Sequence, residues 1–132
     1  FIKGNTDMKS IISKVNLDSA KENEIYTSTT PIPTLSWSKD KIIFTKSDAK
    51  YTGGEIIEID SQGGNDNKIM ETKNGLGIFP NLSSDGLNIG YVAVTYNDGF
   101  KKNALGDIKV SSNLGLNIKK FSSGTQILGW LP

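Results

Sequence analysis

The chain has 132 residues, a formal net charge of +1 and neither Cys nor His, and all 15 of its basic residues are Lys. These absences exclude a Ser-His-Asp triad, a thiol nucleophile, disulfides, thiolate metal sites and bidentate Arg–phosphate contacts. The balanced charge argues against a nucleic-acid partner, and no apolar run of about 18 residues exists that could span a membrane as a helix.

Strand signals dominate the sequence. Short runs rich in β-branched and aromatic residues alternate with Gly, Asn, Asp and Ser clusters about every 8–12 residues. The best helix candidate, Met8–Leu17, alternates in its second half, so we interpret it as a strand. In chain order, the predicted strands are Phe1–Lys3, Ser10–Leu17, Glu24–Thr27, Leu35–Trp37, Lys41–Lys46, Glu55–Asp60, Asn67–Thr72, Ile78–Leu82, Asn88–Tyr96, Asp107–Ser112, Asn117–Phe121 and Ile127–Leu131.

Two sequence elements recur in the same order. Val15–Ser19 (VNLDS) matches Ile57–Ser61 (IEIDS) 42 residues later, and Pro33–Asp40 (PTLSWSKD) matches Pro80–Gly86 (PNLSSDG), whose first residue lies 47 positions further on. Four short strands in a repeat of about 45 residues are typical of propeller blades. A plain antiparallel sandwich with similar hairpins is the alternative.

The predicted fold class is therefore all-β: a β-propeller segment of about three four-stranded antiparallel blades. It divides into a partial first blade (1–30), a second blade (31–76), a third blade (77–124) and the opening strand of a further blade (125–132). Because Phe1 is not an initiator Met and no signal peptide follows, we expect a processed or excised piece.

The blade motifs resemble those of the TolB-like β-propeller family. Leu35–Asp40 leading into Ile42–Phe44, and Gly54–Asn65 ending in DSQGGN, are similar to the family's blade; Asp85–Gly86 followed by Ile89–Tyr91 repeats the pattern. Lys39 stands where the family often has Pro, which marks a remote relative. The resemblance implies a bacterial protein in the periplasm or at the cell surface. It also implies A–B and C–D turns on one face and B–C and D–A loops on the other.

Three blades do not comfortably close around a channel, because propellers usually have about four to eight. The chain is expected to be a fragment of a larger, six-bladed propeller, or a half-ring that pairs as a homodimer to close six blades. The final strand, Ile127–Leu131, could complete the first blade in cis or in trans.

The B–C segments Ser47–Gly54 and Asn97–Gly106 are the longer loops, and binding groups usually lie on such loops. Aromatic anchors within a polar surround suit protein recognition. The predicted protein-binding residues on this face are Tyr51, Tyr96, Asn97, Asp98, Phe100, Lys101 and Lys102, with packing against a neighbouring blade as the alternative.

Other candidate sites have simpler interpretations. Asp60–Asn67 carries oxygen ligands that Ca²⁺ accepts, but its spacing favours a turn at Gly63 and Gly64. Glu55, Glu58 and Asp60 lie along one strand and are interpreted as solvated, because a glycosidase needs carboxyls facing across a cleft. Trp37 and Trp130 are assigned to blade packing. No metal or cofactor is expected.

The predicted function is a non-catalytic propeller that binds another protein of unknown identity through its B–C and D–A loops. Two alternatives stay open. One is a propeller gating a prolyl-oligopeptidase-like hydrolase whose catalytic domain lies outside this chain; the other is a structural repeat of a cell-surface protein.

Overall fold

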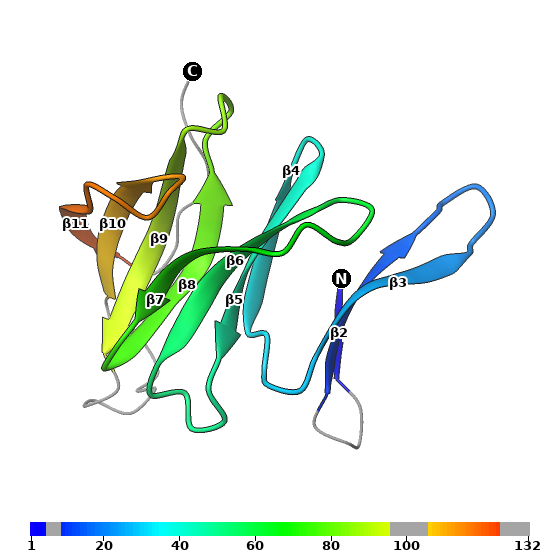
Figure 1. Ribbon diagram of the computed structural model, residues 1–132, viewed down its shortest axis with the longest axis horizontal. Coiled ribbons are helices and arrows are strands. Elements are labelled where there is room, and N and C mark those ends of the chain that lie inside the picture. Colours follow the sequence, from blue (N-terminus) through cyan, green and yellow to red (C-terminus); the bar gives the residue numbers. More distant parts are fainter. Residues whose placement is uncertain (5–8, 96–105, 125–132) are drawn as a thin grey trace.

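The computed structural model describes residues 1–4, 9–95 and 106–124, and these form three antiparallel sheets. The middle sheet lies between the other two, as Figure 1 shows. The all-β prediction is confirmed. Within the described ranges, no helix has the length and apolar character needed to cross a membrane.

The first sheet has the order β1 (Ile2–Gly4), β2 (Ser10–Val15), β3 (Glu22–Ser28). The region predicted to be a strand rather than a helix is a strand, but it ends at Val15 instead of Leu17. The cause is local: the side-chain oxygen of Asn16 accepts hydrogen bonds of 3.0 Å from two backbone N–H groups further along, which turns the chain.

The middle sheet has four strands in sequential order: β4 (Thr34–Ser38), β5 (Lys41–Ser47), β6 (Gly54–Asp60) and β7 (Asn67–Thr72). Their bounds agree with the predicted strands to within a residue. Sequential antiparallel pairing of four short strands is the arrangement of a propeller blade.

The third sheet repeats this order with β8 (Gly75–Leu82), β9 (Asn88–Thr95), β10 (Gly106–Ser112) and β11 (Lys119–Gly124). The prediction placed the last strand two to three residues too early. Asn117 has a φ of +56°, a left-handed conformation that a strand does not contain. The division into blades at residues 31, 77 and 125 stays a prediction.

Apolar side chains fill the spaces on both faces of the middle sheet. Ile42, Ile43 and Phe44 are consecutive in β5 and all buried, because alternate residues point to opposite faces and both faces are covered. The cluster toward the first sheet contains Ile12, Ile32, Ile42, Phe44, Ile57 and Ile59. The cluster toward the third sheet contains Ile43, Ile56, Ile69, Met70, Leu82, Ile89 and Tyr91.

Hydroxyl groups also join the middle sheet to β8. Ser36 donates to the carbonyl of Pro80 at 2.5 Å, and the backbone N–H of Phe79 donates to the Thr34 hydroxyl at 3.0 Å. The buried hydroxyl of Thr45 donates to the carbonyl of Gly77 at 2.5 Å. Directional bonds of this kind set the register between two sheets that apolar packing alone would leave free to slide.

Candidate protein-binding face

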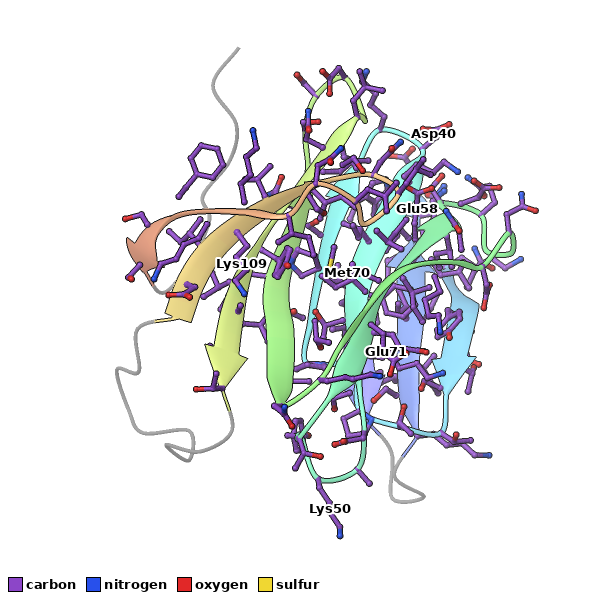
Figure 2. All side chains as sticks on the ribbon, turned by 60° about the vertical axis from the view of Figure 1, so that its left-hand side comes forward. Asp40, Lys50, Glu58, Met70, Glu71 and Lys109 are labelled. Carbon is purple, nitrogen blue, oxygen red and sulfur yellow. The ribbon has the colours of Figure 1, made fainter. Side chains whose placement is uncertain are left out.

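The strand connections divide between the two ends of the sheets. We define the loop face as the end formed by the connections 29–33, 48–53 and 73–74, and the turn face as the end formed by the turns 16–21, 39–40, 61–66, 83–87 and 113–118. Figure 2 shows Lys50 at the tip of the loop face and Asp40 at the opposite end. In the middle sheet, the expected difference in length is absent: the connections 48–53 and 61–66 both have six residues.

Asp48 builds the loop 48–53. Its carboxylate accepts hydrogen bonds from the backbone N–H of Lys50 at 3.0 Å, from the backbone N–H of Thr52 at 2.8 Å and from the Thr52 hydroxyl at 2.6 Å. The Thr52 hydroxyl is the main cause that holds the pKa of Asp48 below its usual value. Backbone N–H groups add to this effect, and a slight loss of hydration opposes it. A loop that is internally bonded in this way presents its side chains in fixed positions.

Tyr51 is the predicted site residue that the structure describes. Its backbone has a φ of +58°, a conformation that few non-Gly residues adopt, and its N–H donates to the carbonyl of Asp48 at 3.1 Å. The side chain is 36% exposed. The other predicted residues, Tyr96, Asn97, Asp98, Phe100, Lys101 and Lys102, lie outside the described residues.

Backbone hydrogen bonds join the three connections of the loop face into one surface. The N–H of Gly75 donates to the carbonyl of Thr52 at 2.7 Å, which joins the loop to the start of β8. The N–H of Ser47 donates to the carbonyl of Pro31 at 2.9 Å, which joins β5 to the connection between the first and middle sheets. The face is therefore supported by all three sheets.

An open hollow of about 620 Å³ lies beside this loop. Charges of both signs surround it: Glu55 is 4.0 Å from the ammonium of Lys46 and 3.3 Å from that of Lys68, and Glu71 is exposed on β7. Most of the residues that line the hollow were not predicted as site residues from the sequence. The lining residues are Thr30, Lys46, Ser47, Asp48, Thr52, Gly53, Gly54, Glu55, Glu71, Thr72, Lys73 and Asn74.

The turn face carries two of the three carboxylates weighed for catalysis from the sequence, Glu58 and Asp60, whereas Glu55 lines the hollow on the loop face. Lys41 contacts Asp60 at 2.7 Å and Glu58 at 3.4 Å, so these two acids share one lysine. The interpretation of these acids as solvated is only partly right, because the Glu58 side chain is 15% exposed. Gly63 and Gly64 have φ values of +85° and +87°, which agrees with the predicted turn.

Metal-binding side chains do not cluster in the part of the chain that the structure describes. No group of three or more His, Cys, Asp or Glu that could hold a metal ion is found within residues 1–4, 9–95 and 106–124. Trp37, assigned to packing from sequence, is 48% exposed, and its ring nitrogen donates to the carbonyl of Lys39 at 2.8 Å.

Comparisons with known proteins identify the fold through solved structures. No protein-family model matches the chain, and no curated protein matches its sequence. A TolB crystal structure from Acinetobacter baumannii is similar with a TM-score of 0.64 and 19% identity, over 84% of this chain and 26% of that one. A structure assigned as TolB from Agrobacterium tumefaciens is similar with a TM-score of 0.75 and 17% identity, over 93% of this chain and 45% of that one.

This chain has a TolB-like β-propeller fold. The resemblance predicted from the blade motifs is thereby confirmed at the level of the fold. The chain spans less than half the length of either TolB structure. At sequence identities below 20%, the similarity shows the fold alone. The binding properties of this TolB-like chain are therefore inferred from its own residues.

Proposed function

We propose that the chain is a non-catalytic, TolB-like propeller module that binds another protein through its loop face. The observation that carries the proposal is the loop 48–53, which the Asp48 carboxylate holds in place. This loop presents the exposed Tyr51, and its residues Asp48, Thr52 and Gly53 line the hollow of about 620 Å³. Binding residues are commonly found on such loops, positioned by a rigid scaffold.

The chemistry of the face favours a protein partner. An aromatic side chain contributes a large contact area with few rotatable bonds, and Tyr is enriched at binding hot spots. The surrounding lysines, carboxylates and hydroxyls form the polar rim that protein interfaces usually have. Charges of both signs, as with Lys46 and Glu55, suit a mixed protein surface better than a polyanion.

Other parts of the sequence-based interpretation stay predictions. The periplasmic or cell-surface location rests on the resemblance to TolB-like proteins alone. The hydrolase-gating role would require a catalytic domain in addition to these sheets. Neither is needed for the proposal that the loop face binds protein.

Site-specific photo-cross-linking tests the proposed face. A photoreactive amino acid replaces Lys50 on the loop face or, as the matched control, Asp40 on the turn face; both positions are exposed and lie at opposite ends of the molecule. Discrete cross-linked products from position 50, and none from position 40, are expected in the cells that make the protein. Products from position 40 alone would refute the assignment of the face.

A substitution then measures the contribution of the aromatic ring. Tyr51→Asn removes the ring but keeps a residue that tolerates positive φ, so the loop retains its shape. With the cross-linked partner purified, calorimetry should show about 30-fold weaker binding, as expected for an anchor contributing about 2 kcal/mol. Lys21→Asn, an exposed change on the turn face, is the control and should bind as the unchanged protein does. Equal affinity of Tyr51→Asn and the unchanged protein would remove Tyr51 from the interface.

A further inference from the structure

Large apolar side chains are exposed on two turns of the third sheet, 83–87 and 113–118, which both belong to the turn face. The backbone N–H of Asn113 donates to the carbonyl of Leu87 at 2.9 Å, which joins these turns. Exposed apolar patches usually mark a surface that binds a protein or a membrane. We define the apolar tip as the four apolar residues of the two turns, each 50% to 67% exposed: Leu87, Leu114, Leu116 and Ile118.

The middle sheet has the same pair of turns, but with polar residues. The N–H of Ser61 donates to the carbonyl of Asp40 at 2.7 Å, as that of Asn113 does to Leu87. The turn between β6 and β7 has six residues, like the turn between β10 and β11, and in each a Gly with positive φ donates its N–H to the last residue of the preceding strand. The fold therefore accepts polar residues at these positions and does not require the apolar tip. The counterparts of its four residues, in the same order, are Asp40, Gln62, Gly64 and Asp66.

The exposure of these positions is a property of the turns themselves. The middle sheet has apolar clusters packed on both of its faces, yet all four of its counterpart residues are exposed. A sheet stacked on the third sheet in the same way would therefore leave the apolar tip uncovered. The tip is thus available to a partner whatever lies beside the third sheet.

Hydrogen bonds and packing hold the turn 113–118 in shape. Ser112 accepts from the N–H of Gly115 at its carbonyl, at 2.9 Å, and from the N–H of Leu116 at its hydroxyl, at 3.2 Å. The N–H of Ser112 in turn donates to the carbonyl of Leu116 at 2.9 Å. An added Cβ at Gly115 would clash with the carbonyl oxygen of Ile69 in β7, so the turn lies tightly against the middle sheet. A turn whose backbone groups are bonded internally is inexpensive to place against hydrocarbon.

Two lysines directly follow the apolar tip in the chain. Lys119 and Lys120 are exposed at the start of β11, and the segment 114–121 contains no acid. Lys120 contacts Asp107 at 2.7 Å in a pair that solvent reaches on both sides. The acid of the neighbouring turn, Asp85, accepts hydrogen bonds from a Ser hydroxyl and a backbone N–H of that turn. Ammonium groups beside exposed leucines suit an anionic lipid surface, because the lysine stems lie along apolar groups while their charges reach the headgroups.

We propose that the apolar tip inserts into the surface of a membrane that contains anionic lipids, with Lys119 and Lys120 at the level of the headgroups. Its residues do not form a hollow that could receive an apolar segment of a protein. The hollow of about 310 Å³ on the turn face is lined mainly by charged and hydroxyl side chains, and by none of the four residues of the tip. The loop face lies at the opposite end of the sheets, so insertion would leave the proposed protein-binding surface free.

Flotation of the full chain with vesicles is the first test. The chain should bind vesicles made of equal parts phosphatidylglycerol and phosphatidylcholine, and it should bind vesicles of phosphatidylcholine alone at least about fivefold more weakly. Added salt should weaken the binding to the mixed vesicles, because it screens the lysines. A chain that does not float with the mixed vesicles at low salt would overturn the proposal.

Substitutions copied from the middle sheet test the apolar side chains. Leu114→Gln and Ile118→Asp introduce the residues that the middle sheet carries at the same positions, so the turn should keep its shape, and circular dichroism checks this. Together they should weaken binding to the mixed vesicles about tenfold or more. Tyr51→Asn, which removes an exposed ring at the opposite end, should bind vesicles as the unchanged protein does. Equal vesicle binding by the double variant and the unchanged protein would exclude the apolar tip as the inserted part.

A matched pair of lysine variants tests the charge. Lys119→Gln should weaken binding to the mixed vesicles about fivefold and leave binding to phosphatidylcholine vesicles unchanged. Lys50→Gln makes the same change of charge at an exposed position of the loop face and should have no effect on either. Equal losses from the two variants would show that net charge alone attracts the chain, which contradicts the proposed orientation.

A fluorescent label measures insertion directly. Because the chain has no Cys, an environment-sensitive dye can be attached to one introduced thiol. The dye on Leu116→Cys should brighten and shift to the blue on the mixed vesicles, whereas the dye on Lys50→Cys should not. A response at position 50 but not at position 116 would place the wrong end of the molecule against lipid. Protein cross-links from a photoreactive residue at position 116 in cells, without a dye response on vesicles, would assign the apolar tip to a protein partner instead.

Discussion

Thr45→Val tests how the middle and third sheets are held together. Thr45 is fully buried in β5, and its hydroxyl donates to the carbonyl of Gly77 in β8 at 2.5 Å. It also accepts a hydrogen bond of 3.3 Å from the hydroxyl of Thr34. Valine has nearly the shape of threonine without the hydroxyl, so the change removes both hydrogen bonds and leaves almost no cavity.

The expected loss follows from the groups left without a partner. A buried acceptor whose donor is removed costs about 1–3 kcal/mol, and the free energy of unfolding of a domain is only about 5–15 kcal/mol. For a chain of this size, each kcal/mol corresponds to a fall of roughly 4 °C in Tm. Thr45→Ser, the control, keeps the hydroxyl and loses one methyl group, which costs about 0.8 kcal/mol of hydrophobic burial before any cavity effect.

Urea unfolding followed by tryptophan fluorescence measures both variants. All samples are compared at one protein concentration, because any association would add to the apparent stability. The Val variant should be less stable than the Ser variant. A Val variant within about 0.5 kcal/mol of the unchanged protein would show that the hydroxyl does not join the sheets.

Three further changes probe the core and the turn face. Phe44→Ala should lower the free energy of unfolding by about 3–5 kcal/mol in chemical denaturation, because the ring is fully buried between the first and middle sheets. Gly77→Ala should lower Tm, since an added Cβ would lie 2.9 Å from the ring of Tyr91; an unchanged Tm would mean that this ring moves aside at little cost. Lys41, first among the causes, holds the pKa of Asp60 below its usual 3.8, so the stability that this pair contributes at neutral pH should be lost as the pH falls below about 4. Lys41→Met should make this acid loss shallower, and an identical profile in thermal scans across pH would contradict the pairing.

The strands could be predicted because their sequence signals are local. Alternating or continuous apolar runs bounded by Gly, Asn, Asp and Ser place all eleven described strands to within about three residues at each end. The largest differences are at the start of β8, which begins at Gly75 rather than Ile78, and at the end of β11. The errors arise where a backbone departs from the strand conformation. Asn117, with positive φ, delays β11, and Phe79, with a φ of +52°, lies in the irregular part of β8.

The candidate face was less predictable because its residues come together only after folding. Lys46, Glu55 and Glu71 lie on three different strands, and no sequence pattern relates them. The spacing of Asp48 and Thr52 is the signal that was available: an Asp followed by Thr four residues later closes the loop through its side chain. That spacing indicates an ordered loop. Whether the loop can bind a partner depends on the residues that lie beside it in the folded chain, which come from β7 and the start of β8.

The two faces of β4 show how such sheets recognise one another. Thr34 and Ser36 point to one face and are hydrogen-bonded to β8, whereas Leu35 and Trp37 point to the other. Leu35 packs against the apolar cluster beside the first sheet. Hydroxyl groups thus set the register on one face of β4, while apolar side chains fill space on the other face. A strand of this kind is fully covered only when a neighbouring sheet packs against both faces. Among the described strands, only β8 packs closely along β4 from a neighbouring sheet, and the ring of Trp37 on the other face is therefore half exposed.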